Sequence, residues 1–249
     1  MLSIEPQAGV APIVQLIRNA HREINVGVYY MTDRKILDAL KAARERGVTV
    51  RVMVEPKPYG MKSWQVRKEV RAIEATGAQF HWVPSRFVSH GSYWAFYHAK
   101  YIASGHEAEI GNPNFSWSDF HDARNYLYIT HNATVVKAVN AVFQADWTRT
   151  RAPAWTHRAL VLSPGTSVRQ IVEAIDQPGP ISIEDEEIGP YAPVIDAIET
   201  KGRLARVIEP SNISPEDRRV DQELEAHGVQ VRLLPVKPIY LHAKLIVGS

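Results

Sequence analysis

The chain has 249 residues, of which 45% are hydrophobic and 22% charged, an ordinary globular composition with room for two moderate domains. It has no cysteine, which excludes a disulfide framework, and no apolar run approaches the roughly 18 residues of a membrane span. With 29 Lys and Arg against 27 Asp and Glu, the net charge of +2 is too small to indicate a nucleic-acid binder by its bulk field.

Strands and helices alternate along the first half of the sequence. The stretches "INVGVYY" (residues 24–30) and "TVRVMV" (residues 49–54) have the β-branched content of buried strands. Between them, residues 33–47 predict a helix that ends at a glycine, with one apolar stripe formed by Ile36, Leu37, Leu40 and Ala43. A second helix is predicted from an N-cap at Ser63 to a stop at Gly77, with one face formed by Val66, Val70 and Ile73.

The same order of elements occurs a second time. "IEPQAGVAPIVQLI" (residues 4–17) matches "LSPGTSVRQIVEAI" (residues 162–175), and "INVGVYYM" (residues 24–31) matches "ISIEDEEI" (residues 181–188). Each half then reaches the tripeptide His-Ala-Lys, and its two copies begin at His98 and His242, 144 residues apart. This period is too long for a solenoid and indicates duplication of a whole domain. We therefore predict an α/β fold of two tandem α/β/α domains with mostly parallel mixed sheets, related by a pseudo-two-fold axis.

The expected boundary lies in "TRTRAPAWTH" (residues 148–157), which has no apolar period and looks like a linker. The expected domains are residues 1–150 and residues 151–249.

The repeated His-x-Lys pattern suggests phosphate chemistry. On a strand, residues i and i+2 point to the same face, so His98 can act with Lys100 and His242 with Lys244. An imidazole can be nucleophile, acid or base near neutral pH, and a lysine beside it supplies positive charge for a phosphate. Two such halves could present two imidazoles to one phosphorus from opposite sides, as in-line attack with leaving-group protonation requires.

These residues resemble the phospholipase D superfamily, whose pattern is HxKxxxxDxxxxxxGSxN. The first copy, "HAKYIASGHEAEIGNPNF", keeps His98, Lys100, Gly111 and Asn114. This copy departs from the pattern at three points. It has one residue fewer between Lys100 and Gly111, it has no Asp at the third position of the motif, and Asn112 replaces the usual small hydroxyl residue. The second copy keeps His242 and Lys244, and the sequence ends at Ser249, before its Asp and GSxN segment. We expect the second domain to lack roughly 40 residues by comparison with the first.

The resemblance implies a mechanism through a phosphohistidine. One histidine attacks the phosphodiester, and the other protonates the departing alcohol and then activates water or an acceptor alcohol. We assign His98 as nucleophile and His242 as acid and base, with the reverse order left open. The resemblance implies that Lys100, Lys244 and Asn114 hold the non-bridging oxygens, and that neither a metal nor another cofactor takes part.

Further residues are predicted to contact the substrate. Asn112 belongs to the first motif, and the repeat places Glu186 where Tyr29 stands, at the end of a buried strand. An insertion over residues 85–97 leads directly into His98, and its Trp94 and Phe96 are expected to line the mouth of the pocket. The basic segment "PKPYGMKSWQVRK" (residues 56–68) is interpreted first as a solvated helix face and second as a contact for nucleic acid or lipid headgroups.

Three functions remain open. The first is hydrolysis or transfer of a phosphatidyl group, as in phospholipase D or cardiolipin synthase, with a phospholipid as the phosphodiester substrate and peripheral contact with a membrane. The second is a metal-independent nuclease, and the third is a catalytically impaired binding or structural member. The sequence leaves the oligomeric state open, and because the amino terminus lacks the regions of a signal peptide, it fits both a cytoplasmic protein and an exported mature form.

Overall fold

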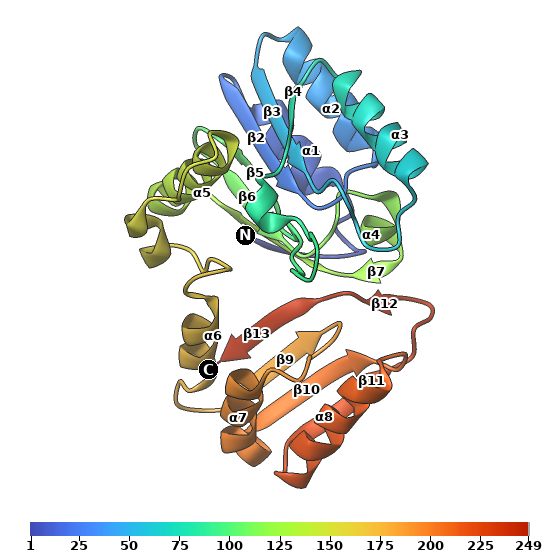
Figure 1. Ribbon diagram of the computed structural model, residues 1–249, viewed down its shortest axis with the longest axis vertical. Helices are drawn as coiled ribbons and strands as arrows, with labels where there is room; N and C mark the ends of the chain where they lie inside the picture. The colour runs from blue at the N-terminus through green and yellow to red at the C-terminus, as the bar shows by residue number, and fades with distance from the viewer. Residues whose placement is uncertain (249) are drawn as a thin grey trace. The chain divides into compact units, whose positions relative to one another are not determined.

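The computed structural model describes residues 1–248, which form two compact units (Figure 1). The first unit comprises Met1–His121 and Leu127–Leu160. The second comprises Asp122–Tyr126 and the chain from Val161 onward. The units are therefore not two consecutive blocks of sequence, and the expected division of the chain after residue 150 stays a prediction.

A seven-stranded sheet forms the centre of the first unit. Its strands, in spatial order, are β1 (Leu2–Ile4), β8 (Tyr126–Thr130), β6 (Ala108–Gly111), β5 (Lys100–Ser104), β2 (Glu23–Val28), β3 (Thr49–Val54) and β4 (Gln79–Trp82). Strands β2, β3, β4 and β6 run in one direction, and β5 and β8 run in the other. The sheet is therefore mixed, and most of these strands run in the same direction, as predicted.

Five α-helices accompany this sheet in the described chain: α1 (Ala11–Asn19), α2 (Arg34–Glu45), α3 (Ser63–Glu74), α4 (Trp117–His121) and α5 (Ala133–Trp147). Two short 3₁₀ turns, η1 (Ser85–Phe87) and η2 (Ala154–Arg158), complete the regular structure. Asp33 is the N-cap of helix α2, and its carboxylate accepts the backbone N–H groups of Lys35 and Ile36 at 2.9 and 3.1 Å. Helix α3 also follows its prediction, but its N-cap is Lys62 and not Ser63, because the Gln65 side chain accepts the Lys62 N–H at 2.8 Å.

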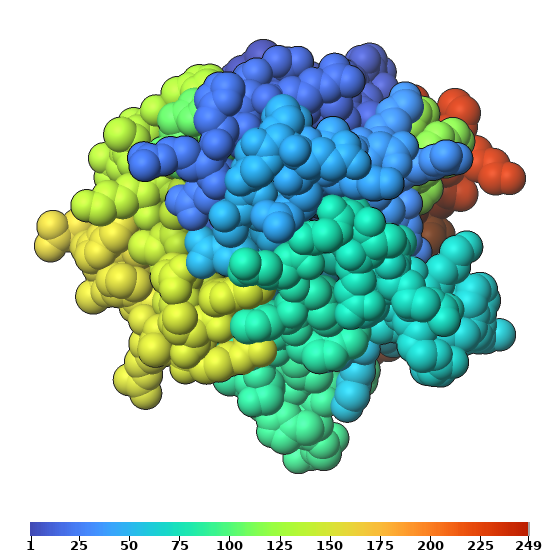
Figure 2. Space-filling view, turned by 90° about the horizontal axis from the view of Figure 1, so that it is seen from above, coloured from blue at the N-terminus to red at the C-terminus, as the bar shows by residue number. Residues whose placement is uncertain are grey.

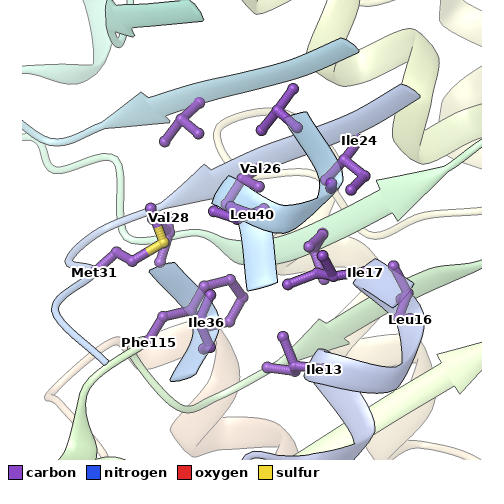
Figure 3. Close-up of a cluster of buried hydrophobic side chains, with 14 of the residues drawn as sticks. Ile13, Leu16, Ile17, Ile24, Val26, Val28, Met31, Ile36, Leu40 and Phe115 are labelled. Atoms are coloured by element: carbon purple, nitrogen blue, oxygen red, sulfur yellow. The ribbon is translucent and has the colours of Figure 1, made fainter. Parts of the chain in front are cut away.

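The core of the first unit lies on both faces of the sheet. On one face, the apolar stripes of α1 and α2 pack against β2, as Figure 3 shows for Ile13, Leu16, Ile17, Ile24, Val26, Val28, Met31, Ile36, Leu40 and Phe115. Because successive strand residues point to opposite faces, Asn25 and Gly27 face the other side, where α5 packs. There Phe143 of α5 joins Tyr97 and Tyr101 in a second cluster. Each buried Ile, Leu or Phe contributes about 1.5–3 kcal/mol, so these two layers hold the end of β2 in place.

The second unit repeats the order of the first. Its sheet has the order β11 (Gln230–Leu234), β10 (Ala205–Pro210), β9 (Ile181–Asp185) and β13 (Lys244–Gly248), matching β4, β3, β2 and β5. The directions match too, since β9, β10 and β11 are parallel and β13 is antiparallel to β9. Its helices are α6 (Ser167–Ile175), α7 (Ala192–Lys201) and α8 (Pro215–Ala226), with a 3₁₀ turn η3 (Gly202–Leu204). The predicted α/β class and the internal repeat are confirmed.

A small two-stranded sheet completes the second unit. Strand β12 (Tyr240–Leu241) pairs in parallel with β7 (Ala123–Arg124). The pairing continues as the His242 N–H donates to the carbonyl of Arg124 at 3.1 Å. A segment from the first half of the sequence thus lies directly beside the second His-x-Lys motif.

Candidate active site

The first His-x-Lys motif begins the strand that lies beside β2. Lys100 opens β5 and pairs with Val28, and the Tyr29 N–H donates to the carbonyl of Ala99 at 2.9 Å. The Lys100 ammonium donates to the carbonyl of His98 at 2.8 Å and is 5% exposed. This bond folds the lysine back onto its own motif, so its charge lies next to the histidine.

Aromatic rings line this motif. The Tyr29 ring lies edge to face against His98, with ring centroids 4.5 Å apart, and the Lys100 Nζ lies 5.0 Å from the centre of the same ring. Phe96 contacts Tyr29 at 6.1 Å, and Trp94 contacts Phe96 at 5.4 Å between centroids. The three predicted aromatic residues therefore form a continuous line that ends at His98. Burial raises the pKa of Tyr29, so the phenol stays neutral.

The outer end of this line projects from the surface. Trp94 is 72% exposed, and in the space-filling view residues 85–97, coloured teal to green, form a protrusion (Figure 2). Most of this tryptophan's surface therefore faces solvent, and its ring contacts Phe96 on one side. It is available to an apolar or aromatic ligand.

Asn112 and Asn114 follow β6, and the backbone next to them is fixed to the end of β2. The Phe115 N–H donates to the carbonyl of Tyr30 at 3.0 Å, and the Phe115 carbonyl accepts the Thr32 N–H at 2.8 Å. The Asn114 N–H donates to the Asp119 carboxylate at 3.1 Å, and the Asn114 side-chain amide donates to the same oxygen at 3.4 Å. The structure thus places the asparagine segment at the end of β2 that also carries Tyr29.

The second motif has the same backbone arrangement. The Glu186 N–H donates to the carbonyl of Ala243 at 3.0 Å, and the Lys244 ammonium donates to the carbonyl of His242 at 2.9 Å. Glu186 therefore occupies the position of Tyr29, which confirms the equivalence predicted from the repeat.

Where the first motif has an aromatic ring, the second has a carboxylate. Glu186 Oε2 lies 2.6 Å from Lys244 Nζ and 3.4 Å from His242 Nε2, and the Tyr240 hydroxyl donates to Glu186 Oε1 at 3.0 Å. Burial alone would raise the pKa of Glu186, but the charges of His242 and Lys244 and the bonds from Lys244 and Tyr240 outweigh it and lower the pKa. Glu186 is therefore an ionised carboxylate.

Asn125 completes the surroundings of His242, and the sequence did not indicate it. It is fully buried, and its Oδ1 lies 2.8 Å from His242 Nδ1. An amide oxygen can only accept, so this bond places a proton on Nδ1. The available signal was a polar residue in the middle of "ARNYLYIT", directly after the first motif. Its partner lies 117 residues further on, and no local pattern connects the two.

A shallow cavity of about 480 Å³ lies elsewhere in the first unit, between β4 and the end of α5. It is lined by Phe80, His81, Trp82, Trp147, Thr148 and Arg149, none of which is a predicted site residue. Among residues 1–248, no group of three or more His, Cys, Asp or Glu side chains is arranged to hold a metal ion. The expectation that the chemistry needs no metal stays a prediction. None of the described helices combines the length and apolar character needed to cross a membrane.

Known structures share this fold. Nuc from Salmonella typhimurium, a phospholipase D family member, has 19% identical residues and a TM-score of 0.51, and the match covers 61% of this chain and 96% of that chain. NucT from Helicobacter pylori has 15% identity and a TM-score of 0.52, over 59% of this chain and 96% of that one. Polyphosphate kinase from Porphyromonas gingivalis has 16% identity and a TM-score of 0.69, over 99% of this chain and 42% of the kinase.

A comparison with curated proteins gave no match. The family model described as "Cardiolipin synthase, PLD-like domain" matches residues 13–147, which include the whole first motif. Since this match covers more than half of the chain, the protein belongs to the cardiolipin synthase, phospholipase D-like family.

Proposed function

We propose that the chain is a phosphodiesterase that works through a phosphohistidine and hydrolyses or transfers a phosphatidyl group. The observation that carries this proposal is the second copy of one local structure. In the first unit, His98 and Lys100 lie beside the end of β2, which pairs with β5. In the second unit, His242 and Lys244 lie in the same way beside the end of β9, which pairs with β13. In both units the lysine ammonium donates to the carbonyl of the histidine in its own motif. A histidine that only stabilised the fold would not need the same lysine, strand end and hydrogen bond twice.

The first chemical step forms the covalent intermediate. A ring nitrogen of His98 attacks phosphorus with its lone pair, a P–N bond forms, and the P–O bond to the leaving alcohol breaks with its electron pair on oxygen. His242 gives a proton to that oxygen. In the second step a water or alcohol oxygen attacks phosphorus, its proton passes to His242, and the P–N electron pair returns to His98. The mechanism requires both imidazoles at one phosphorus, which stays a prediction.

The remaining site residues stabilise charge and orientation. Lys100, Lys244 and Asn114 are proposed to contact the non-bridging oxygens, whose negative charge the transition state redistributes. Asn112 is proposed to contact the substrate beside Asn114, because it lies in the same loop after β6. Asn125 holds the His242 ring through Nδ1 and leaves Nε2 for proton transfer.

The aromatic line favours a lipid substrate. Trp94, Phe96 and Tyr29 lead from an exposed loop to His98, so an acyl chain or glycerol backbone could lie on them while the phosphate meets the histidine. The family match to the cardiolipin synthase domain points the same way. We therefore propose a membrane-surface phospholipid as the substrate, with Trp94 entering the headgroup region.

A nuclease is the second candidate, favoured by one surface of the first unit. Tyr59 and Trp64 are 80% and 54% exposed, and they lie in the segment that contains Lys57, Lys62 and Arg67. Exposed rings among cations are the features that bind single-stranded nucleic acid, through base stacking and phosphate contacts.

One panel of assays separates the candidates. The chain is incubated, with EDTA present, with bis(p-nitrophenyl) phosphate, with vesicles of phosphatidylcholine and phosphatidylglycerol, and with single-stranded DNA. We expect turnover of the chromogenic diester and of the vesicle lipid. Turnover of DNA with none of lipid would establish the nuclease instead.

Three variants accompany this panel. His98→Asn and His242→Asn should each lower turnover by about 10²- to 10⁴-fold, the usual contribution of a positioned acid-base group. His21→Asn, which changes an exposed histidine outside the site, should match the unmodified chain. Equal activity of all three variants, or no activity of the unmodified chain on any substrate, would refute the proposed function. Activity that disappears with EDTA and returns with a divalent ion would refute its metal independence.

A further inference from the structure

The two His-x-Lys motifs differ at one equivalent position. The backbone N–H of Tyr29 and that of Glu186 make the same bond to the middle alanine of each motif, at 2.9 and 3.0 Å. The side chains that leave these positions are a phenol in the first unit and a carboxylate in the second. The two copies of the repeat therefore differ in the charge of the side chain that lies next to the histidine.

In the second unit the carboxylate directly faces the imidazole. Glu186 Oε2 lies 3.4 Å from His242 Nε2, which is 13% exposed in its side chain. The Asn125 amide at Nδ1 is a polar neighbour of the ring without charge. An ionised carboxylate at this distance favours the protonated imidazolium.

The other charged groups around this pair belong to several elements. Lys244 of β13 shares Glu186 Oε2 at 2.6 Å, and Tyr240 of β12 bonds to Oε1 at 3.0 Å. Asp185 and Glu187 flank Glu186 in the chain, and Asp217 of α8 hydrogen-bonds to Glu187. Lys244 opposes a second positive charge on His242, and Glu186 contacts both cations, so its carboxylate is the group that allows them to coexist.

In the first unit the equivalent position adds no negative charge. The Tyr29 ring contacts His98 edge to face at 4.5 Å and lies 5.0 Å from the Lys100 ammonium. Burial raises the pKa of its hydroxyl above the ordinary value, so the ring stays neutral across the physiological range. A neutral ring beside Lys100 favours the unprotonated, nucleophilic imidazole at His98.

We propose that Glu186 keeps His242 protonated and so prepares it to give a proton to the leaving oxygen. This inference rests on the proposed function, in which His98 is the nucleophile and His242 the acid. Glu186 is a positioning residue in this account: the proton that reaches the leaving oxygen comes from His242 Nε2, and Glu186 neither gives nor takes it.

The first test needs no substrate. Imidazole ¹⁵N chemical shifts of His242 are followed against pH in the unmodified chain, in Glu186→Gln and in Glu187→Gln, with the signal assigned by its loss in His242→Asn. Glutamine keeps the size of the side chain and removes its charge, and it retains one of the two oxygens that accept from Lys244 and Tyr240. We expect the His242 midpoint to fall by at least about 1 pH unit in Glu186→Gln and to stay unchanged in the control Glu187→Gln. Equal midpoints in all three proteins would overturn the inference.

The second test uses the leaving group as a probe. p-Nitrophenol departs as an anion and needs little protonation, whereas an alkyl alcohol needs a proton. Glu186→Gln should therefore lower kcat for an alkyl diester at least about 10-fold more than for bis(p-nitrophenyl) phosphate, and the alkaline limb of its pH profile should move to lower pH. A variant damaged only in its fold would lose the same factor on both substrates, and that result would overturn the inference.

The third test exchanges the two positions. Tyr29→Glu combined with Glu186→Tyr should move the phosphohistidine, trapped by alkaline quench and located by peptide mass spectrometry, from His98 to His242. An adduct that remains on His98 would show that other groups fix the order. If the His98→Asn and His242→Asn variants keep full activity, the proposed function fails by itself, and the ¹⁵N midpoints still decide whether Glu186 controls the charge of His242.

Discussion

Replacing Glu69 with glutamine should stabilise the protein at alkaline pH and leave its stability almost unchanged near pH 5. Glu69 lies in α3 and is 1% exposed, and its Oε1 accepts the backbone N–H of Met31 at 2.7 Å. Its Oε2 accepts no hydrogen bond from any residue that the structure describes. Burial of this carboxyl raises its pKa from 4.5 to about 8, with the bond from Met31 acting in the opposite direction.

The sign of the pH dependence follows from this pKa. The folded state binds a proton that the unfolded state releases above about pH 4.5, so stability is lost as pH rises from about 4.5 to about 8. At about 1.4 kcal/mol for each pH unit, the full difference is on the order of 5 kcal/mol. Glutamine keeps the oxygen that Met31 needs and has no proton to lose. We expect a gain of about 2–4 kcal/mol at pH 8.5 and less than about 1 kcal/mol at pH 5.

Urea unfolding at intervals from pH 5 to pH 9, followed by circular dichroism, measures this difference. Glu74→Gln, at the exposed end of the same helix, is the matched control and should show no gain that grows with pH. A stability difference between Glu69→Gln and the unmodified chain that stays constant from pH 5 to pH 9 would refute the reasoning, because it would show that this carboxyl does not retain its proton in the folded protein.

Three further changes test other parts of the structure. Gly27→Ala places a methyl group 2.5 Å from the buried Tyr101 ring, so it should destabilise the first unit by about 1–3 kcal/mol, and an unchanged thermal midpoint would contradict this packing. Asn125→Ala leaves His242 Nδ1 without its acceptor and should lower kcat about 10- to 100-fold, whereas an effect on KM alone would assign it another role. Trp94→Ala should weaken vesicle binding several-fold and leave turnover of bis(p-nitrophenyl) phosphate unchanged; equal loss on both substrates would place this ring in the chemistry instead.

Local patterns predicted the elements that depend on local physics. The β-branched run at residues 49–54 became β3 at the same bounds, and the apolar stripe of Ile36, Leu40 and Ala43 is buried in α2. The equivalence of Tyr29 and Glu186 also followed from the sequence, because it depends only on counting along two matching repeats. Such features involve residues close together in the chain, or two copies of the same short pattern.

Features that depend on distant partners could not be predicted in this way. Asn125 and His242 meet because β7 pairs with β12, and a pairing between residues 117 apart leaves no trace in either segment. Even the start of α3 was misplaced by one residue, because the Gln65 side chain satisfies the backbone of Lys62 while Ser63 is already helical.

The discontinuity of the second unit limits how its sequence can be moved or divided. A fragment that starts at Val161 contains β9, β10, β11 and β13 but not Asp122–Tyr126, so it lacks both the partner strand of β12 and the amide that holds His242. Such a fragment would keep the sequence of the second motif but would lose β7 and Asn125, which contact it. The duplicated halves are therefore not interchangeable modules, and neither recombination at the linker nor expression of the separate halves can transfer the second motif intact.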